Sequence, residues 1–105
     1  MSEMAGAVAR QWTGVAKPGR ADDYLQHLRH ETLPALRRLA GFVHVIVMRR
    51  EVGDGTEFQV VTVWSSRDAI QAFAGKDIET AVVPPAAQAL LVRYDERVVH
   101  YTIAQ

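Results

Sequence analysis

Two neighbouring segments of the chain are apolar on both of their faces. The first runs from Phe42 to Glu51 (FVHVIVMRRE) and the second from Thr56 to Trp64 (TEFQVVTVW). Both are rich in β-branched residues and predict strands, and Gly53 and Gly55 between them suit the turn of a hairpin. An antiparallel sheet with one face in water alternates apolar and polar residues. Both faces of this hairpin are therefore expected to be covered.

The other segments complete an element order of β-α-β-β-α-β. We predict a strand over residues 7–15, a helix over 20–40, a short helix over 67–74, a second helical piece from 84 to about 94, and a last strand over 96–103. Ser65 and Ser66 are the candidate caps of the short helix. This order predicts an α+β, ferredoxin-like βαββαβ fold, with a four-stranded antiparallel sheet in the order 4-1-3-2 and helices on one face.

The long helix is predicted from an apolar stripe at spacings of three and four residues. Its members are Ala21, Leu25, Leu28, Thr32, Leu36 and Leu39. Pro34 lies inside the pattern and should kink the helix, because it removes one ladder hydrogen bond. His27, His30 and Glu31 fall on the side away from the stripe and do not form the H-E-x-x-H pattern of zinc hydrolases. We interpret them as a solvated face and expect no metal site.

The chain length limits how the second sheet face can be covered. With 105 residues the chain suffices for one domain, residues 1–105, and its first six residues are expected to be flexible. No segment is left over to cover the second face of the sheet. A second copy of the chain is the simplest cover, so we predict a homodimer formed by sheet-to-sheet packing.

Composition excludes several classes of function. Twelve Lys and Arg balance twelve Asp and Glu, which gives no overall field for nucleic acid or an anionic membrane. The absence of cysteine excludes disulfides and thiolate chemistry. The start of the chain lacks the pattern of a secretion signal, and no run approaches the roughly 18 apolar residues of a membrane span. We therefore expect a cytoplasmic protein without membrane or nucleic-acid partners.

Several segments, in this order, resemble the antibiotic biosynthesis monooxygenase family between about Arg10 and Thr102. They are RQWTG in the first strand, Gly41-Phe42, FQVVTVWSS, the helix RDAIQAFAG, and VVHY at residues 98–101. The resemblance implies two ferredoxin-like subunits joined into a dimeric α/β barrel. Some members of the family oxidise polycyclic phenols with molecular oxygen and no cofactor, while others cleave haem.

The resemblance also bears on the cofactor. Family members that cleave haem use a histidine on the short helix after the tryptophan, whereas RDAIQAFAGKDIE in this chain has none. No G-x-G-x-x-G or G-x-x-x-x-G-K-[ST] motif is present either. We therefore expect no cofactor, and a cofactor-independent monooxygenase acting on a small aromatic or phenol-like substrate.

Three residues are candidates for catalysis. Trp64 ends the third strand just before the helix cap, and the resemblance implies that its indole lines a pocket, where it can stack on a flat substrate. His100 lies among apolar residues of the last strand and can act as a general base. His44, on the edge strand, is a second candidate base. The competing interpretations are core packing for Trp64, a backbone or dimer contact for His100, and solvent exposure for His44.

Four further residues are candidates for substrate binding: Arg10, Trp12, Tyr24 and Phe73. Arg10 and Trp12 share one face of the central first strand, where an arginine is costly unless it meets an anion. Arg10 either binds an acidic or enolate-bearing substrate or pairs with Glu57 or Asp95, and we favour the pairing. Tyr24 and Phe73 either close the pocket or pack in the core.

Two other functions stay open. The first is a non-catalytic homodimer that binds a small hydrophobic ligand or another protein. The second is an isomerase or a decarboxylase on the same fold, which the sequence does not separate from an oxygenase. A pocket with perturbed titratable groups would favour an enzyme.

Overall fold

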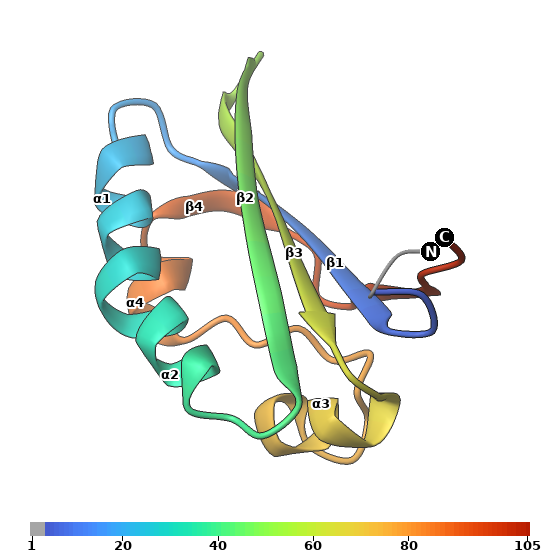
Figure 1. The fold of residues 1–105 in the computed structure, drawn as a ribbon. Coiled ribbons are helices and arrows are strands. Elements are labelled where there is room, and N and C mark those ends of the chain that lie inside the picture. Colours follow the sequence, from blue (N-terminus) through green and yellow to red (C-terminus); the bar gives the residue numbers. More distant parts are fainter. Residues whose placement is uncertain (1–3) are drawn as a thin grey trace.

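A twisted antiparallel sheet with helices along one face forms the fold (Figure 1). The structure is a computed structural model and describes residues 4–105. Its elements are β1 (Val8–Ala16), α1 (Ala21–His27), the π-helical turn η1 (Leu28–Thr32), α2 (Leu33–Arg37), β2 (Phe42–Val52), β3 (Gly55–Trp64), α3 (Arg67–Ala74), α4 (Pro85–Gln88), β4 (Leu91–Tyr94) and β5 (Val99–Thr102). The predicted α+β ferredoxin-like fold is confirmed.

The strand order is β2-β3-β1-β4, and β5 also pairs with β1. The hairpin of β2 and β3 is antiparallel, as predicted, with Val47 opposite Val60. In the central pair Arg10 lies opposite Thr62 and Trp12 opposite Val60. These side chains point to the face that the helices cover, where the core residues Tyr24, Leu28, Phe58 and Val60 meet.

Two short strands, β4 and β5, lie along one edge of β1, and only β5 falls within the last predicted strand, residues 96–103. β4 pairs with Gly14 to Ala16, and β5 pairs with Val8 to Gln11. Between them the chain leaves β1, and Arg97 forms a bridge with Thr80. The prediction of a helix through Tyr94 is wrong, because α4 ends at Gln88 and the next residues pair with the free edge of β1.

The long helix contains a π-turn in the middle. The backbone N–H of Leu33 donates to the carbonyl of Leu28, five residues back. Pro34 follows directly and has no N–H to continue the ladder, so the wider turn relieves the clash that proline causes in a regular α-helix. The predicted irregularity is present, and it lies in the turn before Pro34.

Local signals account for α3. Ser66 is its N-cap, and the Ser66 hydroxyl accepts a hydrogen bond from the backbone N–H of Ala69. Gly75 ends the helix with φ of 85°, a conformation that glycine adopts without steric cost. The predicted boundaries of this helix, residues 67–74, are confirmed.

The sheet face opposite the helices carries exposed apolar side chains. On this face, which we call the open face, Ile46 and Met48 of β2 are 44% and 45% exposed. Val99 and Tyr101 of β5 are 52% and 55% exposed. No element among residues 4–105 covers these side chains. This agrees with the prediction that no segment of the chain is left over to cover the second face of the sheet.

The first described residues and the C-terminal residues lie together beside β1. The N–H of Gly6 donates to the carbonyl of Ile103 at 2.8 Å, and residues 4–6 form a turn. Of the six residues expected to be flexible, the first three lie outside the described residues. No helix within residues 4–105 has the length and apolar character that a membrane crossing requires.

Candidate functional site

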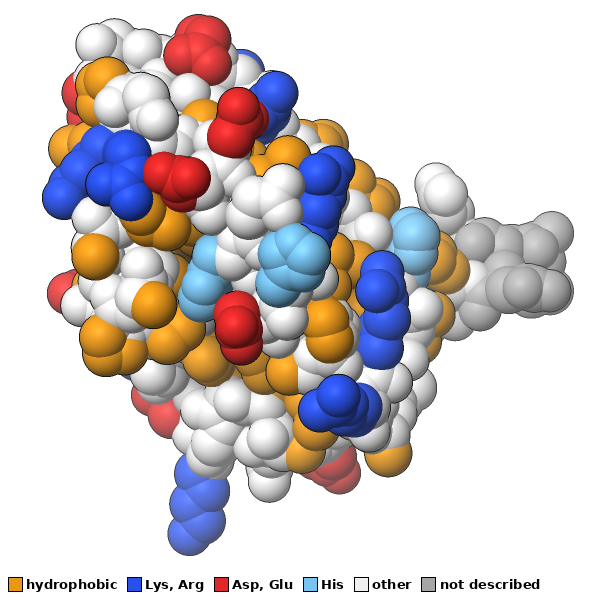
Figure 2. Space-filling model, turned by 90° about the vertical axis from the view of Figure 1, so that its left-hand side faces the viewer, with side chains coloured by type: hydrophobic (Ala, Val, Ile, Leu, Met, Phe, Trp, Pro, Cys, Tyr) orange, Lys and Arg blue, Asp and Glu red, His pale blue; other side chains and the backbone are white. Residues whose placement is uncertain are grey.

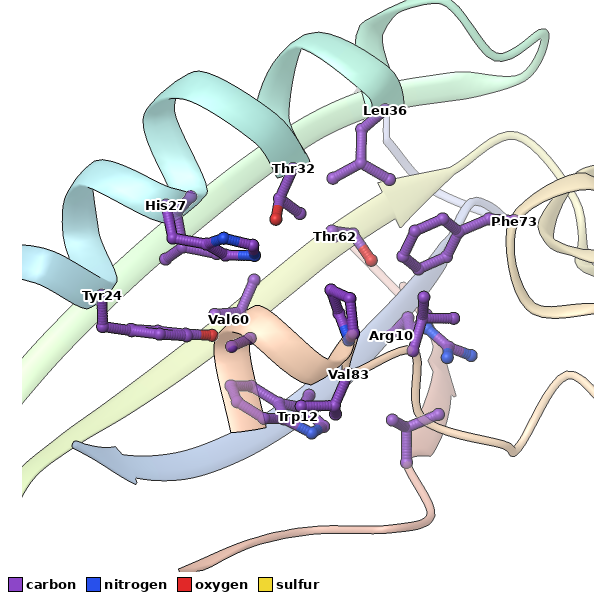
Figure 3. Close-up of a pocket in the computed structure, with 15 residues that line it drawn as sticks. Arg10, Trp12, Tyr24, His27, Thr32, Leu36, Val60, Thr62, Phe73 and Val83 are labelled. Atoms are coloured by element: carbon purple, nitrogen blue, oxygen red, sulfur yellow. The ribbon is translucent and has the colours of Figure 1, made fainter. Parts of the chain in front are cut away.

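A pocket lies between the sheet and the long helix (Figure 3). It has a volume of about 60 Å³. Fifteen residues line it: Arg10, Trp12, Tyr24, His27, Leu28, Thr32, Leu36, Val60, Thr62, Phe73, Val82, Val83, Pro84, Ala87 and Val98. The wall is mainly apolar and aromatic and contains a few polar groups, which is typical of a small-molecule site. We call it the sheet–helix pocket.

Arg10 is the one cation on the pocket wall whose charge does not depend on pH near neutrality. It is only 4% exposed, and burial lowers its pKa to about 10, so the guanidinium stays charged at neutral pH. Its Nη1 donates to the carbonyl of Ile78, and its Nη2 donates to the carbonyl of Thr80 at 2.7 Å. Its Cζ lies 5.6 Å from the centre of the Phe73 ring, within the range of a cation–π contact.

The favoured pairing of Arg10 with Glu57 or Asp95 is wrong. Glu57 points to the open face and accepts a hydrogen bond from Arg50 at 2.8 Å. Asp95 contributes its backbone carbonyl to Trp12 and forms no ion pair with Arg10. Among residues 4–105, no carboxylate lies within ion-pair distance of Arg10. The sequence did not reveal this because the facing of Glu57 depends on strand register.

His100 lies beside Arg10 on the neighbouring strand. Its Nε2 is 3.2 Å from Nη1 of Arg10. A guanidinium can only donate, so Nε2 accepts and the imidazole carries its proton on Nδ1. Burial, and then the charge of Arg10, lower the pKa of His100 below its usual value. His100 does not line the pocket. A substrate in the pocket would therefore not touch His100 directly, as its predicted role of base requires.

Trp12 forms one side of the pocket (Figure 3). Its indole Nε1 donates to the carbonyl of Asp95 at 2.9 Å. The ring lies over Gly14, where a Cβ would overlap it. Gly14 therefore makes room for the indole, which lines the pocket, and the role of Trp12 in substrate binding stays a prediction.

Tyr24 and His27 project from α1 into the same pocket (Figure 3). Tyr24 is 3% exposed, and burial raises its pKa well above the usual range, so the phenol stays protonated. The rings of Tyr24 and His27 are stacked with centroids 6.3 Å apart. Tyr24 also packs on Trp12 at 6.2 Å. Tyr24 thus lines the pocket, and its role in substrate binding stays a prediction.

The interpretation of His27 as part of a solvated face is wrong. His30 and Glu31 are exposed as predicted, but His27 is half-buried and lines the pocket. The predicted apolar stripe included Ala21 and Leu25, which placed the buried face of the helix too far to one side. In the structure the buried face is centred on Tyr24 and Leu28. The signal that could have found His27 was its spacing of three residues from Tyr24.

Trp64 belongs to the core and does not line this pocket, so the expectation from the resemblance is wrong in this respect. It is fully buried, and its Nε1 donates to Thr62 Oγ1 at 2.9 Å. Its ring packs between Phe42 at 5.5 Å and Phe73 at 5.9 Å. Trp64 can therefore act on the pocket through Thr62 and Phe73, both of which line it.

His44 is remote from the pocket. It is exposed on the open face, on the opposite side of the sheet. The structure thus gathers Arg10, Trp12, Tyr24 and Phe73 at one pocket, places Trp64 and His100 behind its wall, and separates His44. Within residues 4–105 no group of three or more His, Asp or Glu side chains could hold a metal ion.

Comparisons with known proteins agree with this fold. The family model of the antibiotic biosynthesis monooxygenases matches residues 7–82. A Caulobacter crescentus CB15 protein, provisionally described as such a monooxygenase, has a TM-score of 0.72 at 14% identity, over 97% of this chain and 93% of its own. A conserved protein of Methanosarcina mazei Go1 has a TM-score of 0.69 at 12% identity, over 95% and 94%.

A third solved structure is that of SnoaB, a cofactor-independent oxygenase from Streptomyces nogalater. It has a TM-score of 0.63 at 22% identity, over 96% of each chain. These identities establish the fold and leave the chemistry open. No curated protein is similar enough in sequence to count as a relative. Because the family model covers well over half of its residues, the chain belongs to the antibiotic biosynthesis monooxygenase family.

Proposed function

We propose that the protein is a cofactor-independent monooxygenase that oxidises a small aromatic, phenol-like substrate in the sheet–helix pocket. The observation that carries the proposal is the pocket itself, in which aromatic walls adjoin a buried cation and a histidine. Aromatic side chains stack on a flat ring, and a preorganised positive charge stabilises an anion in a site from which water is excluded. The family and the likeness to SnoaB support an oxygenase.

The proposed reaction begins with removal of the phenol proton. His27 is our candidate base, because it is the histidine on the pocket wall, and His100 holds Arg10 in place. The phenolate gives one electron to oxygen, the two radicals join through a new C–O bond, and the peroxide takes back the proton from His27. The O–O bond then breaks, and the ring C–H proton leaves with the distal oxygen as water. Substrate CH and O₂ thus become a ring carbonyl and water.

We also propose that the protein acts as a homodimer through its open face. Ile46, Met48, Val99 and Tyr101 leave an apolar surface on that face, and monomeric proteins rarely expose contiguous apolar patches of large area. The resemblance to dimeric barrels supports the same arrangement.

A non-catalytic dimer that binds a small hydrophobic ligand is the main alternative, and the apolar lining of the pocket would serve it equally well. An isomerase or decarboxylase would also use a base and a cation, but it would consume no oxygen. Oxygen uptake therefore separates our proposal from both.

The test is oxygen consumption by the purified, metal-free protein with electron-rich phenols, hydroquinones and naphthols. We expect uptake above the uncatalysed rate, with labelled oxygen gas incorporated into the product. His27→Gln should lower the rate by about 100-fold, the typical contribution of a general base. His30→Gln is the matched control, since His30 is exposed on the same helix, and it should keep the full rate.

Two further variants test the residues behind the wall. Trp64→Phe and His100→Ala should lower the rate less than His27→Gln if they act only by supporting Thr62, Phe73 and Arg10. A larger loss with His100→Ala than with His27→Gln would return the role of base to His100. Absence of uptake with every substrate would shift the assignment to the ligand-binding dimer.

A further inference from the structure

We propose that the sheet–helix pocket selects aromatic ligands that carry an oxyanion, either a carboxylate or a phenolate, and that Arg10 binds this oxyanion. The inference rests on the proposed function in taking this pocket as the substrate site. It adds a requirement on the charge of the ligand, which an oxygenase acting on neutral phenols would not have.

The first argument is the charge balance around Arg10. Among residues 4–105 all of its partners are neutral: the carbonyls of Ile78 and Thr80, the imidazole of His100 and the ring of Phe73. A buried cation without an anionic partner is costly. Several exposed arginines of the same chain have carboxylate partners, as Arg93 has in Asp54 and Arg97 in Asp77. Arg10 differs from them in being buried, and it has no carboxylate partner among residues 4–105.

The second argument is the number of donors that Arg10 retains. Arginine has five N–H donors. Contacts with Ile78, Thr80 and His100 occupy three of them among the described residues. The Nε–H and one N–H of Nη2 have no hydrogen-bond partner among these residues, so an oxyanion that reaches the guanidinium could accept from them. Carboxylates and phenolates make their strongest hydrogen bonds with such charged donors.

The third argument is the composition of the rest of the pocket. Neither aspartate nor glutamate lines it, within the part of the chain that the structure describes. An anion in the pocket would therefore meet no like charge on the wall. The other polar groups on the wall, at Tyr24, His27, Thr32 and Thr62, can all donate a hydrogen bond. The apolar and aromatic remainder suits a ring.

These three features also place the two parts of the ligand. Arg10 and Phe73 lie at one end of the pocket, and Tyr24 and His27 lie toward the other (Figure 3). A ligand with its oxyanion at Arg10 would direct its ring toward Trp12, Tyr24 and His27. A hydroxyl on the far side of that ring would then be the one that faces His27.

The test compares two ligands of nearly equal shape, naphthoate and naphthamide, by isothermal titration calorimetry without turnover. A hydrogen-bonded charge adds roughly 10- to 100-fold in affinity, so naphthoate should bind the wild-type protein about that much more tightly. A second arm uses para-nitrophenol, whose ionisation is visible by absorbance, and its pKa should fall on binding. Equal binding of acid and amide, together with an unshifted para-nitrophenol pKa, would overturn the proposal.

Variants of Arg10 assign the effect to its guanidinium. Arg10→Gln should abolish the preference, so that naphthoate and naphthamide bind with equal affinity, and a cooperative urea unfolding transition would show that the variant is folded. Arg10→Lys should keep part of the preference, because it keeps the charge. Arg29→Gln is the matched control: it removes one positive charge from an exposed position of η1 and should keep the whole preference.

The outcomes separate this inference from the proposed function. Selective binding of the oxyanion without oxygen uptake would support the inference and contradict the oxygenase. Oxygen uptake with neutral phenols, together with equal binding of acid and amide, would support the oxygenase and contradict the inference. A preference for naphthoate without a shift for para-nitrophenol would identify the carboxylate as the recognised group.

Discussion

Arg10 and His100 face each other across β1 and β5, and burial together with the charge of Arg10 lowers the pKa of His100. Arg10 keeps its charge, and His100 stays neutral with Nε2 as an acceptor at 3.2 Å. A protonated His100 would place two cations in contact behind the pocket wall. The electrostatics of the pocket are therefore tied to a histidine that does not touch the ligand.

This contact predicts how stability depends on pH. The pKa of His100 is lower in the folded protein than the usual value of 6.5. Below that value the unfolded chain binds a proton that the folded protein resists, so stability falls as pH falls through about 6.5. His100→Gln keeps an acceptor for Arg10 and should flatten this dependence, as measured by urea unfolding at a series of pH values. Equal slopes for the two proteins would contradict the assignment.

Gly14 allows a second prediction at the residue scale. A Cβ there would overlap the indole of Trp12, so Gly14→Ala should displace this ring from the pocket wall. We expect at least about tenfold weaker binding of naphthamide, which corresponds to about 1.4 kcal/mol. Calorimetry measures the loss. Gly53→Ala is the control, because a Cβ at Gly53 meets no atom within 4 Å, and it should leave binding unchanged.

At the scale of elements, the π-turn sets which side chains of the long helix face the sheet. Tyr24, Leu28, Thr32 and Leu36 are spaced by four residues, and all four line the pocket. In an α-helix each step of four turns the side chain by about 40°, so the stripe would leave the sheet within three steps. The wider π-turn compensates for this rotation, so that the four side chains stay on the side of the sheet. Pro34 was the sign of this irregularity in the sequence, and the π-turn itself lies in the five residues from Leu28 to Thr32.

The cap of α3 gives a prediction that concerns stability alone. Ser66 Oγ accepts from the N–H of Ala69 at 3.2 Å, so Ser66→Ala should lower the free energy of unfolding by about 1 kcal/mol. Ser65→Ala is the natural comparison. Ser65 is exposed and lies outside the helix, and its replacement should change stability by less than about 0.5 kcal/mol. Urea denaturation measures both, and equal losses would place the cap elsewhere.

Elements with local signals were predicted well from the sequence, and elements made by distant pairing were not. The hairpin of β2 and β3 and the capped helix α3 follow from turn and capping residues near them in the chain. β4 follows from nothing local: it forms because Gly14 to Ala16 of β1 offer a free edge. The same difference between local and distant signals applies to the site residues. Trp12 and Arg10 share a strand face that parity predicts, whereas the partners of Arg10 come from residues 78, 80 and 100.

At the scale of the whole molecule, charge is evenly mixed and apolar surface is not. Positive and negative side chains alternate over the helix side (Figure 2), in keeping with a net charge of zero. The open face instead exposes Ile46, Met48, Val99 and Tyr101. A partner that covers the open face would therefore be attracted by burial of apolar surface more than by charge.

The proposed dimer leads to a prediction at this scale. Ile46→Lys places a charge on the open face and should shift the protein from dimer to monomer, as measured by light scattering coupled to size-exclusion chromatography. Ala86→Lys adds the same charge at an exposed position of α4, on the helix side, and should keep the dimer. A dimer that persists with Ile46→Lys would contradict pairing through the open face.

Within the described part of the chain, the strand order also leaves β2, eleven residues long, hydrogen-bonded on one side only. A long unpaired edge invites further copies to add strands and so to aggregate. Near its hairpin end β2 carries three consecutive charged residues, Arg49, Arg50 and Glu51, and near its start the register shifts between Phe42 and His44. Charges and bulges at an edge hinder such addition. The edge is thus protected at both ends, so that association through the apolar face need not lead to fibrils.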